Sequence, residues 1–392
     1  MRALVPAHRM SSMKSLHETV ATVATHDGDP ARAEQRVGAA SPLAPARWDW
    51  RDVRRVLVVR LRSIGDTVLA TPALDALRRF LPAARIDLLL EDWVAPLLDG
   101  FDAVDNIITV APGSTRARLS VARALRAAHY DVAYNLHGGT TATLLVRAAA
   151  ARQRVGYASY QYSLLYNHRA PASSELWGRA KTHSVEQQLA LLGWTGVPVS
   201  DRPPTRLVVT PAADASVQTK LRAAGLTEPQ PFALIHPAAA FDSKQWATEN
   251  FARVAEAVAA RGLTPVAIAA PDERAVLTRL CALSSVPIQT FADLTLPEVT
   301  ALAARARLFV GNDSGIAHIA AAVNTPSVVV FGSSNIAHWR PWTRGRAEIV
   351  REEMPCAPCP GYTCGEFAEA QCIRRVTVAR VAAAVESLLA EA

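Results

Sequence analysis

Short apolar runs rich in β-branched residues alternate along this chain with stretches in which apolar residues recur at helical spacing. The alternation occurs twice, once between residues 53 and 203 and again from residue 232 onward. Such alternation predicts parallel strands joined by crossover helices. The polar, Pro-rich segment 200–205 interrupts the periodicity between the two sets. The pattern therefore predicts an α/β fold in which two Rossmann-like domains face one another across a cleft.

The expected elements follow from the spacing of the apolar residues. In the first set the predicted strands are 54–61, 86–90, 106–110, 131–136 and 154–157, and the predicted helices are 67–80, 116–128 and 140–150. In the second set the predicted strands are 232–236, 264–269, 288–291, 308–310 and 327–331, and the predicted helices are 247–260, 273–283, 296–306 and 316–323. A last helix is expected over 376–389.

Length and composition agree with two folded domains. The chain has 392 residues, of which 50% are hydrophobic and 20% charged, so two sizeable cores can form. No apolar run reaches the roughly eighteen residues of a membrane span. Residues 1–50 lack the apolar core of a signal peptide and are expected to form a flexible tail. We therefore expect a cytoplasmic protein.

The net charge of +7, from 42 Lys plus Arg against 35 Asp plus Glu, points to an anionic partner. Nucleic acid, an anionic membrane face and a phosphorylated substrate would each fit. The arginines are scattered rather than gathered in a basic run, and aromatic residues make up only 6% of the chain, which disfavours nucleic acid. A solvated, Arg-rich surface would also account for any single arginine.

The segment from Val310 to His318 reads as the end of a buried strand, a sharp polar turn and the start of a helix. The turn brings Asn312, Asp313, Ser314 and Gly315 to the amino end of that helix. Free N–H groups and the positive end of the helix dipole suit a phosphate there. Gly315 allows close approach, and Asp313 can accept hydrogen bonds from a sugar hydroxyl. The alternative is an ordinary turn in which Asp313 or Ser314 caps the helix.

A second chemistry-bearing turn follows the first predicted strand. Gly65 would permit a tight turn there, and Asp66 would stand at the entrance of the next helix. The Asp66 carboxylate could take a proton from a substrate hydroxyl, while Arg60 and Arg62 supply positive charge nearby. The alternative is that Asp66 only caps the helix.

Three segments carry a resemblance to a known family. Residues 60–74 resemble the amino-terminal signature of glycosyltransferase family 9, the lipopolysaccharide heptosyltransferases. Residues 311–318, together with the downstream pairs Thr325-Pro326 and Phe331-Gly332, resemble that family's donor-binding signature. Residues 236–246 resemble a third signature, and the three occur in the family's order.

The resemblance implies a GT-B fold with an acceptor-binding Rossmann-like domain over 51–203. A nucleotide-sugar donor-binding domain over 204–352 and a Cys-containing loop with a carboxy-terminal helix over 353–392 would follow. It also implies inverting transfer of a heptose from ADP-heptose to the inner core of lipopolysaccharide. The acceptor would be a lipid-anchored precursor, reached by peripheral contact with the anionic inner face of the inner membrane. Each Lys or Arg near such a surface would contribute about 1 kcal/mol.

Carried over by position, the resemblance gives roles to individual residues. Asp66 would be the general base, and Lys244 would contact the diphosphate and offset the charge of the leaving ADP. The remaining donor contacts would come from Asp313, Ser314, Gly315 and His318, and the acceptor contacts from Arg60, Arg62, His137 and Arg154. A buried structural role would explain His318 as well, and a strand-end turn would explain the glycines after His137. No catalytic divalent metal is implied.

The chain departs from the family pattern at two places. Alanines occupy 238–240, where relatives often carry hydroxyl residues, so two donor phosphate contacts would be either absent or replaced by backbone N–H groups. Asn135 stands where many relatives have Asp. These departures concern the identity of the sugar more than the type of reaction.

Four cysteines fall within seventeen residues: Cys356, Cys359, Cys364 and Cys372. Reduced structural thiols, a tetrahedral zinc site or a redox pair would each fit this spacing, and stable disulfides are disfavoured in the cytoplasm. The string Asp27-Gly-Asp29 matches the Asp-x-Asp of metal-using glycosyltransferases, but no strand precedes it and we interpret it as coincidence.

Two other functions stay open from the sequence. The chain could transfer another sugar or use another acceptor, or it could be a GT-B protein that binds a nucleotide sugar without catalysis. A dehydrogenase is disfavoured because no G-x-G-x-x-G follows the first strand, and a P-loop enzyme because G-x-x-x-x-G-K is missing from the sequence.

Overall fold

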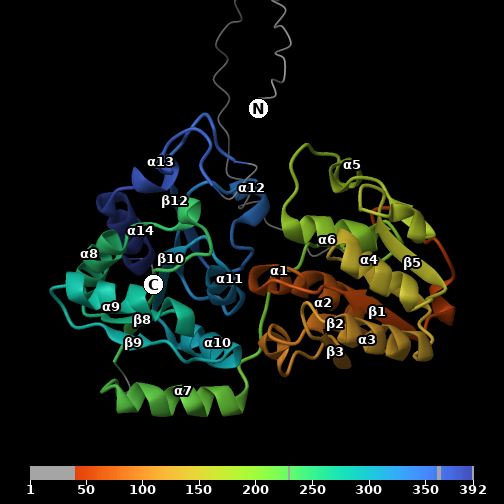
Figure 1. The fold of residues 1–392 in the computed structure, drawn as a ribbon, viewed down its shortest axis with the longest axis horizontal. Helices are drawn as coiled ribbons and strands as arrows, with labels where there is room; N and C mark the ends of the chain where they lie inside the picture. The colour runs from red at the N-terminus through yellow and green to blue at the C-terminus, as the bar shows by residue number, and fades with distance from the viewer. Residues whose placement is uncertain (1–39, 228–229, 360–362, 391–392) are drawn as a thin grey trace, which may run out of the picture. The chain divides into compact units, whose positions relative to one another are not determined.

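The computed structural model describes residues 40–227, 230–359 and 363–390. These residues contain two six-stranded sheets whose strand pairs are all parallel (Figure 1). The first sheet consists of β1 (Arg55–Val59), β2 (Arg85–Glu91), β3 (Asn106–Val110), β4 (Val132–Asn135), β5 (Gln153–Tyr157) and β6 (His168–Ala170). The second consists of β7 (Phe232–His236), β8 (Thr264–Ile268), β9 (Gln289–Phe291), β10 (Leu308–Asn312), β11 (Ser327–Phe331) and β12 (Ala347–Arg351).

Helices connect the strands. Those of the first half are α1 (Ile64–Val68), α2 (Thr71–Phe80), α3 (Thr115–Ala127), α4 (Gly139–Ala148), α5 (Ser173–Trp177) and α6 (Ser184–Gly193). Those of the second half are α7 (Pro211–Ala223), α8 (Thr248–Ala259), α9 (Arg274–Leu283), α10 (Leu296–Arg305), α11 (Gly315–Ala322), α12 (Ile336–Trp339), α13 (Gln371–Arg374) and α14 (Val378–Ala390). In the described ranges, no helix is both long and apolar enough to cross a membrane.

Both sheets have the same strand order. The first runs β3-β2-β1-β4-β5-β6, and the second runs β9-β8-β7-β10-β11-β12. In each sheet the order reverses between the first and fourth strands, β1 and β4 or β7 and β10. A parallel sheet with this order binds ligands beyond the carboxyl ends of the strands at that switch point. The fold therefore marks two places where a ligand is expected.

The central strands are buried on both faces, which explains their continuous apolar character. Every residue of β4, β7, β10 and β11 is buried. The register pairs Val59 with Asn135 in the first sheet and Gly311 with His236 in the second. These pairs bring the polar residues that follow the strands to the same edge of each sheet.

The two halves meet where α1 packs against α11, as Figure 1 shows. A Cβ atom added to Gly65 would lie 2.7 Å from Cδ2 of His318. One added to Gly315 would lie 2.8 Å from Cβ of Ile64. Both distances are too short for real Cβ atoms, so this close approach requires glycine on both helices. The φ of Gly65 is not positive in the described structure, so the close approach of the two helices, and not a tight turn, explains this glycine.

The expected helix 67–80 is wrong as a single element, because the chain forms α1 and α2 instead. Pro72 lies in the first turn of α2 and has no N–H group with which to continue the hydrogen bonds of α1. The apolar spacing also did not predict β6, β12, α5, α6, α7, α12 and α13. Strand β6 has only three residues, and α6 is buried around almost its whole circumference, so neither shows an amphipathic period.

Ordered contacts begin within the segment 1–50 that was expected to be a flexible tail. The N–H of Leu43 donates to Gly193 O at 3.1 Å, and Trp50 Nε1 donates to Thr195 O at 3.1 Å. The Pro-rich segment 200–205 is also held, because Trp342 Nε1 donates to Pro203 O at 3.0 Å.

Candidate functional site

At the first switch point, Arg60 follows β1 and forms an ion pair with Asp66. Its Nη1 also donates to Leu136 O, at the end of β4. The Arg60 side chain is buried, and its Nε has no hydrogen-bond partner within the described residues. A buried donor without a partner is uncommon in proteins and calls for an explanation such as a ligand or a water molecule.

Asp66 is the third residue of α1. Its Oδ2 accepts from the backbone N–H of Ser63 at 3.3 Å and from the Ser63 hydroxyl at 3.2 Å, so the side chain does help to cap the helix. The carboxylate is nevertheless 24% exposed and faces a cavity. Capping and proton acceptance are therefore compatible in this geometry.

His137 lies just beyond β4, in a turn that Asn135 holds. The Asn135 Oδ1 accepts from the N–H groups of His137 at 3.0 Å and Gly138 at 2.9 Å. Gly138 has a φ of 72°, which explains the glycine. Burial and the nearby positive charge of Arg60 lower the pKa of His137 to about 4, so the ring is neutral at pH 7. Its Nδ1 is buried and finds no partner among the described residues.

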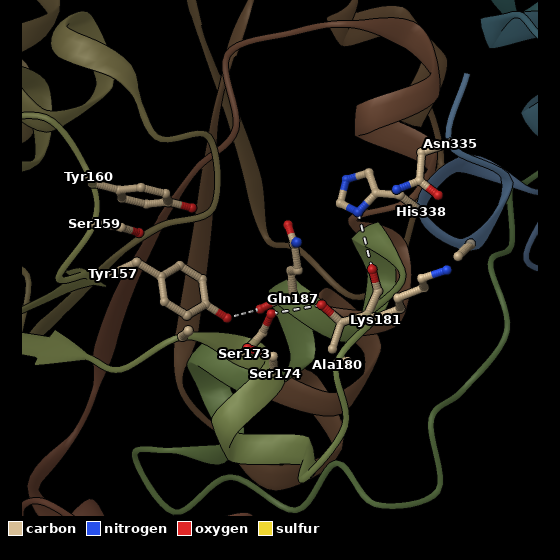
Figure 2. Close-up of a pocket in the computed structure, with 13 residues that line it drawn as sticks. Tyr157, Ser159, Tyr160, Ser173, Ser174, Ala180, Lys181, Gln187, Asn335 and His338 are labelled. Carbon is tan, nitrogen blue, oxygen red and sulfur yellow. Dashed lines mark hydrogen bonds between the residues drawn. The ribbon is translucent and has the colours of Figure 1, made fainter. Parts of the chain in front are cut away.

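A cavity of about 260 Å³ opens at this switch point. Arg60, Asp66 and His137 line it together with side chains from later elements: Tyr157, Tyr160, Ser184, Gln187, Gln188, His338 and Trp339. A neighbouring cavity of about 380 Å³ shares Tyr157, Tyr160, Gln187 and His338 with it (Figure 2).

Two residues assigned to the acceptor, Arg62 and Arg154, line neither of these cavities. The Arg62 side chain is 60% exposed and lies 3.8 Å from a Glu91 carboxylate oxygen. Arg154 is at the amino end of β5, and its Nη1 donates to Ala151 O at 2.8 Å. Ligands gather at the carboxyl ends of parallel strands, which is why Arg154 is not brought to the site.

At the second switch point, β7 ends at His236 and β10 ends at Asn312. The Ser314 Oγ lies 3.3 Å from His236 Nδ1, and within the described residues its side chain does not cap α11. The first N–H groups of α11 therefore donate to no side-chain cap, and they are available to an anion. Burial lowers the pKa of His236 to about 4.

Lys244 and Asp313 form an ion pair at the same end of the second sheet. The Lys244 Nζ lies 2.9 Å from Asp313 Oδ2, and the Ser334 hydroxyl donates to the same oxygen. Asp313 is 6% exposed and Lys244 25% exposed. An ammonium group has three donors, so Lys244 can bind a second acceptor while it holds Asp313.

His318 lies on the buried face of α11, against Gly65 of the other half. Burial lowers its pKa, and its Nδ1 has no hydrogen-bond partner in the part of the chain that the structure describes. The ring therefore occupies the contact between the two switch points.

The alanines at 238–240 lie in a loop that backbone and amide groups hold. Asn312 Nδ2 donates to Pro237 O at 3.0 Å, and the N–H of Ala239 lies 3.3 Å from Gln245 Oε1. Backbone groups at these positions are thus fixed by neighbours other than hydroxyl side chains.

The four clustered cysteines are free thiols, and burial raises the pKa of Cys359 and of Cys372. In residues 40–227, 230–359 and 363–390, no three His, Cys, Asp or Glu side chains are grouped so that they could hold a metal ion. The string Asp27-Gly-Asp29 lies outside the described residues.

Sequence reasoning missed the residues that complete the first cavity. Gln187 and Gln188 are buried or half-buried polar residues in the mostly buried helix α6, and that polar pair was a usable signal. His338 and Trp339 lie on the short helix α12, whose sequence carries no comparable signal.

Comparisons with known proteins agree with this fold. The model of glycosyltransferase family 9 (heptosyltransferase) matches residues 118–368. The chain is 32% identical over 316 residues to lipopolysaccharide heptosyltransferase 3 of Escherichia coli, which covers 75% of this chain and 89% of that protein. Among solved structures it is similar to a family 9 glycosyl transferase from Veillonella parvula, with a TM-score of 0.74 and 19% identity over 86% of this chain and 98% of the other. It is also similar to E. coli ADP-heptose lps heptosyltransferase II, with a TM-score of 0.71 and 23% identity over 86% and 99% of the two chains.

Proposed function

The chain belongs to glycosyltransferase family 9, the heptosyltransferases with a GT-B fold, and we propose that it transfers a heptose from ADP-heptose to the lipopolysaccharide inner core. The names of its relatives supply these substrates, since one is a lipopolysaccharide heptosyltransferase and another an ADP-heptose lps heptosyltransferase. In this proposal residues 51–203 bind the acceptor and residues 204–352 bind the nucleotide sugar. The reaction takes place at the cytoplasmic face of the inner membrane.

The contact between α1 and α11 is the observation that carries the proposal. It brings Asp66, near the start of α1, close to the uncapped amino end of α11 at Ser314 and Gly315. A hydroxyl bound by Asp66 and a diphosphate bound at α11 then lie on two sides of one sugar. Displacement at the anomeric carbon with inversion needs this arrangement of nucleophile and leaving group.

The proposed reaction is a single displacement. An Asp66 carboxylate oxygen takes the proton of the acceptor hydroxyl, and the hydroxyl oxygen attacks the anomeric carbon of the heptose. The bond from that carbon to the β-phosphate oxygen breaks, and ADP leaves with the electron pair. A general base of this kind contributes about 10²- to 10⁴-fold in rate.

The donor site needs positive charge for the leaving diphosphate. In the proposal Lys244 and the first N–H groups of α11 provide it, in place of a divalent metal ion. Asp313 orients Lys244 and accepts a hydrogen bond from a sugar hydroxyl, while His318 closes the site from the buried side of α11. Arg60 and His137 contact the acceptor in the cavity beside Asp66.

ADP release with ADP-heptose and a panel of truncated lipopolysaccharide acceptors tests this function. We expect acceptor-dependent release by the wild type and a loss of about 10²- to 10⁴-fold in Asp66→Asn. Ser63→Ala is the matched control, because it removes one hydrogen bond to Asp66 but keeps the carboxylate and its Arg60 partner. We expect this control to lose less than about tenfold.

An Asp66→Asn enzyme with more than a tenth of wild-type turnover would remove Asp66 as the base. Suppose that the wild-type protein binds ADP in a calorimeter but produces no ADP from ADP-heptose with any acceptor. That result would favour a binding protein without catalysis. The alanines at 238–240, which offer no hydroxyl side chain to the phosphates, are the observation that keeps this alternative in the test.

A basic surface of the first half supports contact with an anionic membrane. Residues 111–173 contain eight arginines and, as their one acidic residue, Asp131, whose carboxylate accepts from the backbone of Arg54 and Arg55. Four large apolar side chains on the same stretch are exposed by 51% to 82%: Leu119, Leu144, Tyr162 and Leu164. Basic and apolar groups together favour a peripheral position at the bilayer.

Flotation with liposomes that contain about a third anionic lipid tests the membrane contact. Arg123 and Arg126 are exposed on α3, and each contributes about 1 kcal/mol near such a surface. We expect the double variant R123E/R126E to lose at least about tenfold in binding. Arg222→Glu, at an exposed position of α7 in the second half, reverses one charge instead of two and should bind like the wild type. Equal loss in Arg222→Glu would mean that net charge alone, rather than this surface, governs binding.

A further inference from the structure

The cavity of about 380 Å³ beside the acceptor cavity has no role in the proposed reaction so far. Its size lies within the range of about 300–1,000 Å³ that is common for ligand sites. It shares Tyr157, Tyr160, Gln187 and His338 with the cavity that Asp66 lines, so the two cavities adjoin and an extended ligand at Asp66 would reach it. Figure 2 shows Tyr157, Ser159 and Tyr160 on one side, with Lys181, Asn335 and His338 opposite.

Polar side chains without protein partners surround this space. Within the described residues, six of the lining side chains form no hydrogen bond or ion pair: Ser159, Tyr160, Ser174, Lys181, Gln187 and Asn335. Hydroxyl and amide groups of this kind recognise the hydroxyl groups of a carbohydrate. The lining therefore has the chemistry of a sugar subsite with most of its hydrogen-bonding capacity available.

The charge of the lining has one sign. Among the described residues that line the cavity, Lys181 is the one with a formal charge, and none is Asp or Glu. Lys181 follows α5 in an exposed segment and lies beyond 4.0 Å from every described carboxylate oxygen. An ammonium group without a counter-ion in a cavity lined by neutral donors favours an anionic ligand group.

Both halves of the molecule build this cavity. His338 Nδ1 lies 3.1 Å from Thr182 O, and His183 Nε2 lies 2.8 Å from Arg340 O, so α12 is docked on the loop that carries Lys181. Asn335 precedes α12 at the N-cap position, yet in the described structure its side chain does not cap the helix. Its amide is thus available on the wall opposite the tyrosines.

We propose that this cavity is an acceptor subsite for a second, anionic sugar, whose phosphate or carboxylate pairs with Lys181 and accepts from Asn335 while the reacting hydroxyl lies at Asp66. The inference rests on the proposed function, because the acceptor is what places a hydroxyl at Asp66. It adds a specificity-determining residue that acts on binding and leaves the chemical step unchanged.

The test compares Lys181→Gln, Lys181→Arg and wild type on truncated lipopolysaccharide acceptors that are intact, dephosphorylated or carboxyl-reduced. Lys181→Gln is expected to raise the KM for the intact acceptor about tenfold, at the lower end for a charge-assisted contact because the side chain is exposed. We expect kcat and the KM for ADP-heptose to change by less than about twofold, and Lys181→Arg to restore most of the loss. Arg222→Gln removes an exposed charge outside the cavity and away from the basic surface, and it should behave as wild type.

The modified acceptors identify the anion. If phosphate is the group that Lys181 binds, the tenfold difference disappears with the dephosphorylated acceptor. If carboxylate is that group, the difference disappears with the carboxyl-reduced one. Asn335→Ala should weaken the same acceptor about threefold and should add little to Lys181→Gln, because both contact one group.

Three results would overturn the subsite. They are an unchanged acceptor KM in Lys181→Gln, an increase in the KM for ADP-heptose instead, and a tenfold effect that survives removal of both anionic groups. Calorimetry of acceptor binding without donor needs no turnover and separates this inference from the proposed function. An acceptor that binds wild type and Lys181→Gln equally contradicts the subsite, whereas wild-type protein that binds acceptor but never releases ADP contradicts the transferase.

Discussion

The two switch points share a strand order but differ in how their polar groups are used. At the second, Asp313 accepts from both Lys244 and Ser334, and Ser314 and His236 contact one another. At the first, Arg60 Nε and His137 Nδ1 are buried without partners among the described residues, and a cavity opens beside them. At the second edge Asp313 fixes the cation Lys244. At the first edge the Arg60–Asp66 ion pair lies beside a cavity that these unpartnered polar groups also line.

Under the proposed function, this difference divides the reaction between two sites of one topology. The strand order decides where a ligand lies, because loops converge at the carboxyl ends of the central strands. The residues that follow those strands decide what is bound. In the proposed reaction, the network around Lys244 would supply fixed positive charge for the diphosphate, and Asp66 would be a carboxylate with room beside it for the attacking hydroxyl.

The largest expected effects come from removing the charged group at each switch point by mutation. Lys244→Gln removes a charge-assisted contact to the diphosphate, which is worth about 1.5–3 kcal/mol, so ADP affinity should fall roughly 10- to 150-fold. Asp66→Asn should leave the affinity for ADP within about twofold while it abolishes most of the transfer. Calorimetry with ADP and initial-rate kinetics on both variants measure the two effects separately.

Lys244→Arg is the matched control, because it keeps the positive charge next to Asp313. It should retain more ADP affinity than Lys244→Gln. If Asp66→Asn weakened ADP as strongly as Lys244→Gln does, the two switch points would not act independently and the division of roles would be wrong.

The sequence was sufficient for the parts of this comparison that lie at strand ends. Continuous apolar runs such as 308–310 and 327–331 predicted central strands, and the polar residues after them, among them Asp66 and Asp313, were recognised because a parallel sheet directs such turns to one edge. Arg154 took its acceptor role from the family resemblance alone, and it lies at the amino end of β5, outside the lining of both cavities.

The rest depended on contacts between distant segments. Tyr157 and His338 share two cavities although 181 positions separate them, and no local pattern records that encounter. Gly65 shows the same limit. A glycine after a strand suggests a turn, but here the contact of α1 with His318 on α11 requires it, and that contact exists only in the folded chain.

The glycine contact offers a way to disturb both switch points at once. Gly65→Ala places a Cβ 2.7 Å from His318 Cδ2, and Gly315→Ala places one 2.8 Å from Ile64 Cβ. Overpacking of this kind typically costs about 1–3 kcal/mol. We expect each variant to lower the unfolding midpoint in urea and, because the base shifts relative to the donor helix, to reduce kcat by about tenfold.

Gly365→Ala is the matched control, because the described structure leaves open space around that position and its φ is not positive. It should have wild-type stability and activity. A wild-type kcat in both Gly65→Ala and Gly315→Ala would separate the α1–α11 contact from catalysis and leave each switch point as an independent site.

The smallest expected effect concerns protonation. Burial holds the pKa of His137 and that of His236 at about 4, against 6.5 for an unburied ring, so both bind fewer protons in the folded chain between these values. The free energy of unfolding is therefore highest above pH 6.5 and falls as the pH is lowered toward 4. Between pH 7.5 and 5.5 each ring should contribute a loss of about 1 kcal/mol.

Urea unfolding at several pH values measures this loss, with His137→Gln and His236→Gln beside the wild type. Each substitution should reduce the drop between pH 7.5 and 5.5 by about 1 kcal/mol, whatever its effect at pH 7.5. The two rings differ in one testable respect. His137 lines a cavity, so a bound acceptor should bury it further and change its contribution to the pH dependence of stability. His236 is already buried at the end of β7, within hydrogen-bond distance of the Ser314 hydroxyl. An acceptor that altered the pH dependence through His236 and not through His137 would reverse the assignment of the two switch points.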